Sequence, residues 1–207
     1  MTDIEYTGEI GAVKAKSSLR VKADLARAQR CRTLVCVLEN PQNLYNITGV
    51  IRTAEGVGVG KIYIVSTKEF IPKTWQAMKA KAMWVNLTAS GVKWVYIRRF
   101  DTTAECLTHL AKRNFTNTAT SPHTLGKQNT SLYSAPPDAF TQHHLAVWFG
   151  NESGGLSDEA MTACKQCIQV PMRGIIESLN LCTSASIVLS YIAHVRIEKT
   201  QHKKKEQ

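Results

Sequence analysis

Short apolar runs alternate with helix-like segments along most of the chain. The apolar runs lie at residues 34–38, 62–65, 94–97, 145–149 and, more weakly, 167–170. The segments between them have the length typical of helices, and they cover 43–56, 73–82, 102–113, 157–164 and 179–199. Continuous apolar runs indicate strands that are buried on both faces, as in parallel sheets. The alternation therefore predicts an α/β fold with a mostly parallel sheet flanked by helices.

Two segments depart from this alternation. Residues 14–31 predict a basic helix before the first strand, and its loose amphipathicity leaves both a solvated helix and an RNA-facing helix open. Residues 120–142 are rich in Ser, Thr, Pro and Gln without periodicity, so we expect a long loop inside the domain. The predicted organisation is a basic extension at 1–32, a domain at 33–196 and a basic tail at 197–207.

The positive charge is concentrated at the two ends of the chain. The 207 residues carry a net charge of +10, of which +6 falls within 14–32 and +3 within 196–207. Basic ends on a nearly neutral body favour a polyanionic partner, nucleic acid ahead of an anionic membrane, and a merely solvated basic surface is the alternative. The candidate RNA-binding residues are Arg20, Lys22, Arg27, Arg30, Lys203 and Lys204.

The cysteines and the first residues argue against several classes of protein. Six cysteines are too few for a disulfide scaffold, and Cys164 and Cys167 form a CxxC pair without the second pair that a zinc site needs. We expect small apolar thiols and no metal. The first ten residues include three acidic side chains and no apolar signal-peptide core, and the uncharged stretch 178–195 is too polar for a membrane span. A cytoplasmic protein without a membrane partner is predicted.

Polar segments rich in Gly, Asn and Ser follow three of the predicted strands. They cover 39–53, 150–157 and 171–180. In open α/β sheets a ligand lies outside the carboxyl ends of the strands, so these segments predict one composite site. Each also has a simpler interpretation: a surface arginine, a strand–turn–helix connection capped by Ser157, and a capped helix N-terminus.

Asn46 and Arg52 are the polar candidates in the first of these segments. They lie six residues apart on one predicted helix, which places them about 120° apart around its axis. They can converge only if Asn46 lies in a frayed first turn.

The three segments, taken in order, resemble the motifs of the SpoU branch of the SPOUT RNA methyltransferases, most closely the tRNA guanosine 2′-O-ribose methyltransferases. The resemblance spans about residues 33–196. The chain departs from the family pattern at Ser153, Cys182 and Tyr191, which bear on substrate and dimer contacts. The matching residues are Glu39-Asn40, Asn46, Arg52-Thr53 and Gly58-Val59 in the first motif, Glu152 and Gly155 within FGNESGGLS in the second, and Pro171-Met172, Gly174 and Ser178-Leu179-Asn180 in the third.

This resemblance implies a C-terminal deep trefoil knot, S-adenosylmethionine as cofactor, and a homodimer with its active sites near the interface. It implies methyl transfer from a sulfonium to a ribose 2′-hydroxyl of RNA. The implied cofactor-binding residues are Thr120, Gly150, Val170 and Leu179, and the implied catalytic residues are Arg52, Asn46, Ser178, Asn180 and Glu152.

Arg52 matches the family's catalytic arginine, with Asn46 and Asn180 positioning it. A guanidinium stays protonated at neutral pH, so a role as general base is hard to sustain. We favour an electrostatic role, in which Arg52 clamps the adjacent phosphate and stabilises the developing alkoxide.

The RNA substrate is left open between two species. About 30 residues before the first strand are too few for a separate RNA-binding domain, which favours tRNA over rRNA. An rRNA 2′-O-methyltransferase and a non-enzymatic RNA-binding protein are the alternatives. RNA binding without S-adenosylmethionine binding would favour the latter.

Overall fold

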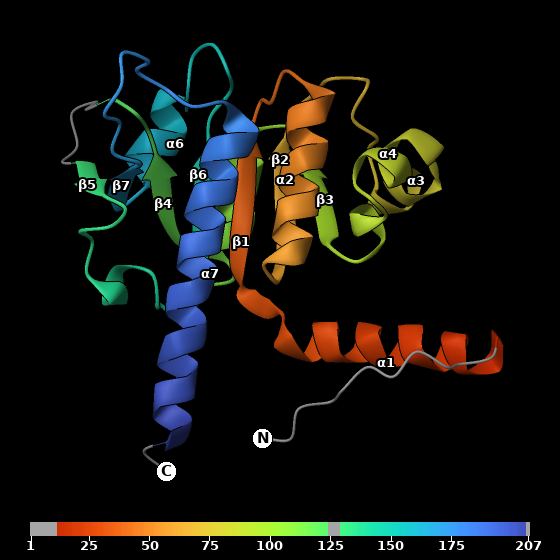
Figure 1. Ribbon diagram of the computed structural model, residues 1–207. Coiled ribbons are helices and arrows are strands. Elements are labelled where there is room, and N and C mark those ends of the chain that lie inside the picture. Colours follow the sequence, from red (N-terminus) through yellow and green to blue (C-terminus); the bar gives the residue numbers. More distant parts are fainter. Residues whose placement is uncertain (1–11, 124–128, 206–207) are drawn as a thin grey trace. The chain divides into compact units, whose positions relative to one another are not determined.

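A seven-stranded sheet organises residues 31–207 in the computed structural model, which describes residues 12–123 and 129–205 (Figure 1). Side chains are described for residue 18 and for residues 20–123 and 129–199. Residues 1–30 form a separate unit, whose described part consists mainly of helix α1 (Ala12–Gln29). The strands are β1 (Cys31–Glu39), β2 (Val59–Val65), β3 (Tyr96–Phe100), β4 (Thr116–Thr120), β5 (Asn129–Ser131), β6 (Leu145–Phe149) and β7 (Gln166–Gln169).

Every strand pairing in the described sheet is parallel, and the strand order is β3-β2-β1-β6-β4-β7-β5. The run from Leu34 to Leu38 in β1 is buried throughout, because both faces of this strand are covered. The predicted α/β fold with a mostly parallel sheet is confirmed. The knot implied by the family resemblance stays a prediction.

Helices cover both faces of this sheet. On one face α2 (Leu44–Gly56) and α7 (Leu181–Lys205) lie side by side (Figure 1), and they pack on Leu34, Cys36 and Leu38 of β1. On the other face α5 (Thr103–Ala111) and α6 (Asp158–Ala163) pack on the alternate residues Val35 and Val37. The remaining helices are α3 (Trp75–Ala80), α4 (Ala82–Leu87) and the 3-10 turns Gly91–Lys93 and Pro137–Ala139.

Small residues allow α2 and α7 to approach closely. A β-carbon at Gly49 would collide with Cys182 Sγ, and Thr53 Oγ1 forms a 2.8 Å hydrogen bond with Ser186 Oγ. The small residues 182–186, which follow the third motif in the sequence, leave room for these contacts. The contacts bring that motif against the first one.

The prediction of a long loop at 120–142 is wrong in part. β5 and a 3-10 turn lie within this segment, and β5 pairs with β7 at the edge of the sheet. β4, which has the polar sequence TNTAT, was not predicted at all. This strand is partly buried, and its polar groups have partners: Trp148 Nε1 donates to Asn117 Oδ1 at 3.0 Å, and Gln166 Nε2 donates to Thr118 Oγ1 at 3.1 Å.

Smaller differences concern element boundaries. The strand expected at 94–97 begins two residues later as β3, and the helix expected at 73–82 is split into α3 and α4 by extended backbone at Lys81. The division into an extension, a domain and a tail stays a prediction. The compact units divide between Arg30 and Cys31, and α7 runs unbroken past residue 197.

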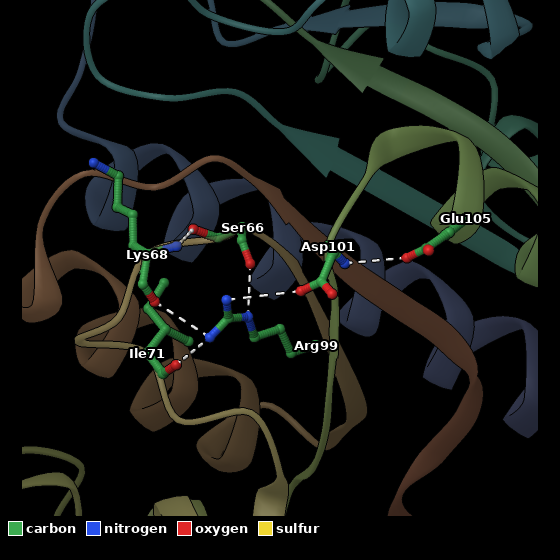
Figure 2. A network of polar contacts seen from close by, with 6 residues as sticks. All are labelled: Ser66, Lys68, Ile71, Arg99, Asp101 and Glu105. Carbon is green, nitrogen blue, oxygen red and sulfur yellow. Dashed lines mark hydrogen bonds and ion pairs between the residues drawn. The ribbon is translucent and has the colours of Figure 1, made fainter.

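Arg99 holds the loop that follows β2 in one conformation (Figure 2). Its guanidinium donates to the backbone carbonyls of Ser66 at 2.6 Å, Lys68 at 3.2 Å and Ile71 at 2.5 Å, and it lies 3.7 Å from the Asp101 carboxylate. The Arg99 side chain is only 6% exposed. Because the donors of a guanidinium have fixed directions, the bonded carbonyls cannot move independently.

We expect Arg99→Gln to lower the free energy of unfolding by about 2–4 kcal/mol, because it leaves buried carbonyls without a donor. Urea denaturation followed by circular dichroism measures the change. Arg98→Gln on the same strand is the matched control, with an expected loss below about 1 kcal/mol because Arg98 is exposed. Equal losses for the two variants would contradict the role given to Arg99.

Candidate active site

The first motif segment forms a turn and the beginning of α2. Asn40 adopts a left-handed conformation with φ 48° directly after β1, and the Asn43 side chain caps α2 by accepting a 2.8 Å hydrogen bond from the Tyr45 N–H. Asn46 therefore lies in the first turn of a regular helix. It is 8% exposed, so its amide is directed into the protein.

A chain of hydrogen bonds joins all three motif segments. Asn180 Nδ2 donates to Asn46 Oδ1 at 3.0 Å, and Asn46 Nδ2 donates to Glu152 Oε1 at 2.5 Å. The backbone N–H of Gln42 donates to Glu152 Oε2 at 2.9 Å. Asn180 Oδ1 accepts from the Cys182 N–H at 2.8 Å and so caps α7. The structure thus brings three of the predicted catalytic residues together in one network.

Glu152 is the ionised end of this network. Partial burial raises its pKa, but hydrogen bonds from the Asn46 side chain and the Gln42 N–H outweigh burial, and the pKa lies below its usual range. An ionised carboxylate only accepts hydrogen bonds. It therefore orients the Asn46 amide with its nitrogen toward Glu152 and its oxygen toward Asn180.

A cavity of about 360 Å³ opens beside the network. It lies at the carboxyl ends of β4, β6 and β7 and reaches the start of α7. Its size falls within the usual range of small-molecule sites. Its lining includes all four predicted cofactor residues, Thr120, Gly150, Val170 and Leu179, and the predicted catalytic residues Glu152 and Ser178.

The segment 150–156 forms a tight wall of this cavity. Asn151 and Gly155 exchange two backbone hydrogen bonds of 3.0 and 3.2 Å, and Gly155 has a φ of 68° that favours glycine. Gly150 packs so closely that a β-carbon there would overlap the backbone of Gly155 and Leu156. The wall can therefore form only with glycine at position 150.

Arg52 lies apart from the cavity of its own chain. It is exposed on α2, whereas Asn46 is buried about 120° away around the helix. Asn46 and Asn180 bind each other, and neither of these described residues forms a hydrogen bond with Arg52. The convergence that the sequence left open does not occur within one chain, because α2 is regular from its capped first turn onward.

Comparison with known proteins agrees with this geometry. The model of the SpoU rRNA methylase family matches residues 33–190. The chain belongs to this family. The tRNA (guanosine(18)-2′-O)-methyltransferase of Thermus thermophilus is 29% identical to this SpoU methylase over 171 residues, which are 82% of this chain and 78% of that protein.

Solved structures share the fold of this SpoU methylase. The TrmH/SpoU tRNA modifying enzyme of A. aeolicus superposes with a TM-score of 0.71 at 24% identity, and the match covers 90% of this chain and 88% of that one. The SpoU methyltransferase AviRb from Streptomyces viridochromogenes, in complex with the cofactor AdoMet, superposes with a TM-score of 0.67 at 20% identity, covering 85% and 66% of the two chains.

Glu39 has a structural role that the sequence analysis of this SpoU methylase missed. Only 5% of it is exposed, and its carboxylate accepts hydrogen bonds from Thr103 Oγ1 at 2.5 Å and from the N–H and hydroxyl of Ser157 at 2.8 and 2.7 Å. It thereby ties β1 to the starts of α5 and α6. A carboxylate that ends a buried strand was the signal, since such a group needs partners. Glu39 also lines a second cavity of about 390 Å³.

The predicted RNA-binding residues are only partly described in the structure. Arg20, Lys22 and Arg27 are exposed on α1, and Arg30 follows that helix. The helix α7 extends to Lys205, but the side chains of Lys203 and Lys204 lie outside the described residues. RNA contact by these residues stays a prediction.

Cys164 and Cys167 are buried in the core between the sheet and α6, as expected for small apolar residues. Within residues 12–123 and 129–205, no group of three or more His, Cys, Asp or Glu side chains could hold a metal ion. In the same part of the chain, no helix is long and apolar enough to cross a membrane.

Proposed function

We propose that this SpoU methylase transfers a methyl group from S-adenosylmethionine to the ribose 2′-hydroxyl of a guanosine in tRNA. One observation carries the proposal: the three motif segments meet in a single hydrogen-bond network beside a cavity that all four predicted cofactor residues line. The similarity to tRNA (guanosine(18)-2′-O)-methyltransferases supports the same reaction and favours tRNA as the substrate.

The residues of the cavity suit this cofactor. Ile168, Val170 and Leu181 offer an apolar surface for an adenine ring, and the backbone of the glycine-rich wall offers hydrogen-bonding groups. The described lining contains the Glu152 carboxylate and neither lysine nor arginine, which favours a ligand with a positive centre. When bound, S-adenosylmethionine supplies a methyl group that is already activated by its sulfonium.

The acceptor hydroxyl must then be placed and made nucleophilic by the protein. Glu152, Asn46 and Asn180 hold the edge of the cavity rigid, and Ser178 in the cavity wall offers a hydroxyl to the ribose. Arg52, always charged, clamps the phosphate beside the target ribose and stabilises negative charge on the 2′-oxygen. The proton leaves to the phosphate or to water.

We infer further that the enzyme acts as a homodimer in which Arg52 serves the cavity of the partner copy. Arg52 is exposed on α2 and does not line the cavity of its own chain. Ile175 is fully exposed and Ile176 is 71% exposed in the segment that ends at the cavity. Apolar side chains of this kind mark an interaction surface. A second copy that covers them would bring its own residues to the cavity edge.

We expect the purified protein to form 2′-O-methylguanosine in tRNA when it is incubated with S-adenosylmethionine in EDTA. Total tRNA and rRNA from cells that lack this protein are the substrates, and mass spectrometry of the digested nucleosides identifies the product. Full activity in EDTA is expected because the described residues include no cluster of three or more His, Cys, Asp or Glu side chains that could hold a metal ion. Formation of the product in rRNA alone would show that rRNA, and not tRNA, is the substrate. RNA binding without cofactor binding would contradict an enzymatic role.

A further inference from the structure

A cluster of cations surrounds the amino end of the sheet on the face that α5 covers. Parallel pairing sets Lys61 of β2 opposite Tyr96 of β3, and it sets Tyr63 opposite Arg98. Because side chains alternate along a strand, these four lie on one face of the sheet. The helix α5 covers Tyr63 and ends just before two more cations. We call the following residues the basic rim: Arg32, Lys61, Arg98, Lys112 and Arg113.

The basic rim surrounds His109, the last-turn histidine of α5. Arg98 Nη1 donates to His109 Nδ1 at 3.3 Å, and His109 Nε2 lies 3.2 Å from the Tyr63 hydroxyl. Burial is the largest cause that lowers the pKa of His109, and with the neighbouring charges of Arg98, Arg113, Lys61 and Lys112 it brings this pKa to about 4. The histidine is therefore neutral at pH 7 and does not add to the charge.

The cations of the basic rim also repel one another. Burial lowers the pKa of Lys61, and Arg113 and Arg32 lower it as well. The ion pairs among the described residues join Arg99 to Asp101, His194 to Glu198 and Lys199 to Asp138, and none includes a residue of the basic rim. Repulsion that no ion pair within the described part of the chain offsets opposes folding, and a bound polyanion would relieve it.

Aromatic side chains accompany these charges. Tyr96, the cross-strand neighbour of Lys61, is 41% exposed, and Lys61 Nζ lies 6.0 Å from the centre of the Phe115 ring. Phe115 in turn stacks on His144 with 4.8 Å between the ring centres. Cations beside an exposed aromatic ring suit RNA, because the cations can bind its phosphates and the ring can stack on its unpaired bases.

The basic rim and the cavity lie at opposite ends of the strands. The cavity is at the carboxyl ends, whereas Lys61 is near the amino end of β2 and Arg32 is near that of β1. The nine residues of β1 separate these ends by about 30 Å. Arg196 of α7 also reaches the amino end, where it donates to Thr33 Oγ1 at 3.2 Å. The chain leading to the basic C-terminal residues therefore passes the same end of the sheet.

We propose that the basic rim binds the phosphodiester backbone of the substrate RNA, at the end of the sheet opposite the methyl-transfer cavity. This inference rests on the proposed function, because it assigns a second contact surface to the same RNA. The proposal adds residues of the folded domain to the RNA-binding residues predicted at the two basic ends of the chain. The rim positions the RNA without reading its sequence, because phosphate contacts carry no sequence information.

The double variant Lys61→Gln/Arg113→Gln tests this surface in the full-length protein. The binding constant K for a tRNA transcript is measured by filter binding at several salt concentrations, and log K is plotted against the logarithm of the salt concentration. We expect the slope of this plot to become shallower by about 1.5 in the variant, because two phosphate contacts are lost. The KM for tRNA should rise while kcat and S-adenosylmethionine affinity stay unchanged. The melting temperature should stay the same or rise, because two repelling charges are removed; a structural role would lower it. Lys112→Gln/Arg113→Gln, two exposed residues, replaces the first variant if that one folds poorly.

The matched control is Lys73→Gln/Lys81→Gln, which removes the same charge from exposed lysines beside α3 and α4. An unchanged salt slope in the rim variant, or an equal loss in the control, would overturn the inference. The inference would also be overturned if the wild-type protein bound anionic phospholipid vesicles and the rim variant lost this binding while its RNA binding stayed intact. Failure of the proposed function is distinguishable, because the wild-type protein would then bind no RNA or transfer no methyl group to it.

Discussion

Replacing Arg52 by alanine is expected to slow methyl transfer about 100- to 1000-fold, the usual effect of removing an electrostatic stabiliser from a transition state. S-adenosylmethionine affinity should remain unchanged, because Arg52 is not among the residues that line the cavity. Stability should also change little, because Arg52 is exposed on α2. Single-turnover methyl transfer to tRNA measures the first effect, and calorimetric titration with the cofactor measures the second.

Arg52→Lys separates the phosphate-clamp role from a simple requirement for positive charge. Lysine is a point charge and cannot make the paired hydrogen bonds of a guanidinium to a phosphate. We therefore expect it to recover only part of the lost rate. Near-full activity of Arg52→Lys would contradict the phosphate-clamp role. A large loss of cofactor binding in Arg52→Ala would show that Arg52 acts on the cofactor and not on the RNA substrate.

Gly150→Ala is expected to abolish cofactor binding and to lower the free energy of unfolding by about 3 kcal/mol. The new methyl group would overlap the backbone of Gly155 and Leu156, which cannot yield without breaking the paired hydrogen bonds between Asn151 and Gly155. The cavity wall would then shift. Calorimetry with S-adenosylmethionine and urea denaturation measure the two effects.

Gly154→Ala is the matched control in the same wall. A methyl group there would meet only the Asn151 side-chain amide, at 3.7 and 3.9 Å, which is ordinary contact. We expect cofactor affinity to stay within about twofold and stability to change by less than about 1 kcal/mol. Similar losses in both variants would show that the wall is not constrained at Gly150.

The two inactive variants together test the proposed dimer. If Arg52 serves the partner's cavity, a mixed dimer of Arg52→Ala and Gly150→Ala chains contains one intact site. Random assembly from equal amounts of co-expressed chains then restores about a quarter of the wild-type rate, since half of the dimers are mixed and each has one working site of two. No recovery would place Arg52 and the cavity in the same chain.

The amino-acid sequence determined the type of fold and named several of the residues that meet at the cavity. Apolar runs such as 145–149 match their strand residue for residue, because burial on both faces demands a continuous apolar segment. Polar segments after strands pointed to the regions of Asn46 and Asn180, and the family resemblance named Glu152 and the four residues that do line one cavity. Capping by Ser157 was also readable, because a helix start needs a local acceptor, whereas the structure selects Asn180 as the cap of α7.

Only the tertiary structure decided how these parts are used. The strand β4 could not be predicted from a polar sequence whose hydrogen-bond partners, such as Trp148 and Gln166, are distant along the chain. Likewise, Arg99 looks like an ordinary charged residue until the fold surrounds it with carbonyls, and the partners of Glu39 on α5 and α6 are known only from the fold. The side of α2 that carries Arg52 became known only when α7 and the sheet had taken the other sides. The local pattern of hydrophobic and polar residues predicts which residues are buried and which form turns. The hydrogen-bond partners of a buried polar group, in contrast, come from segments that are far apart in the sequence.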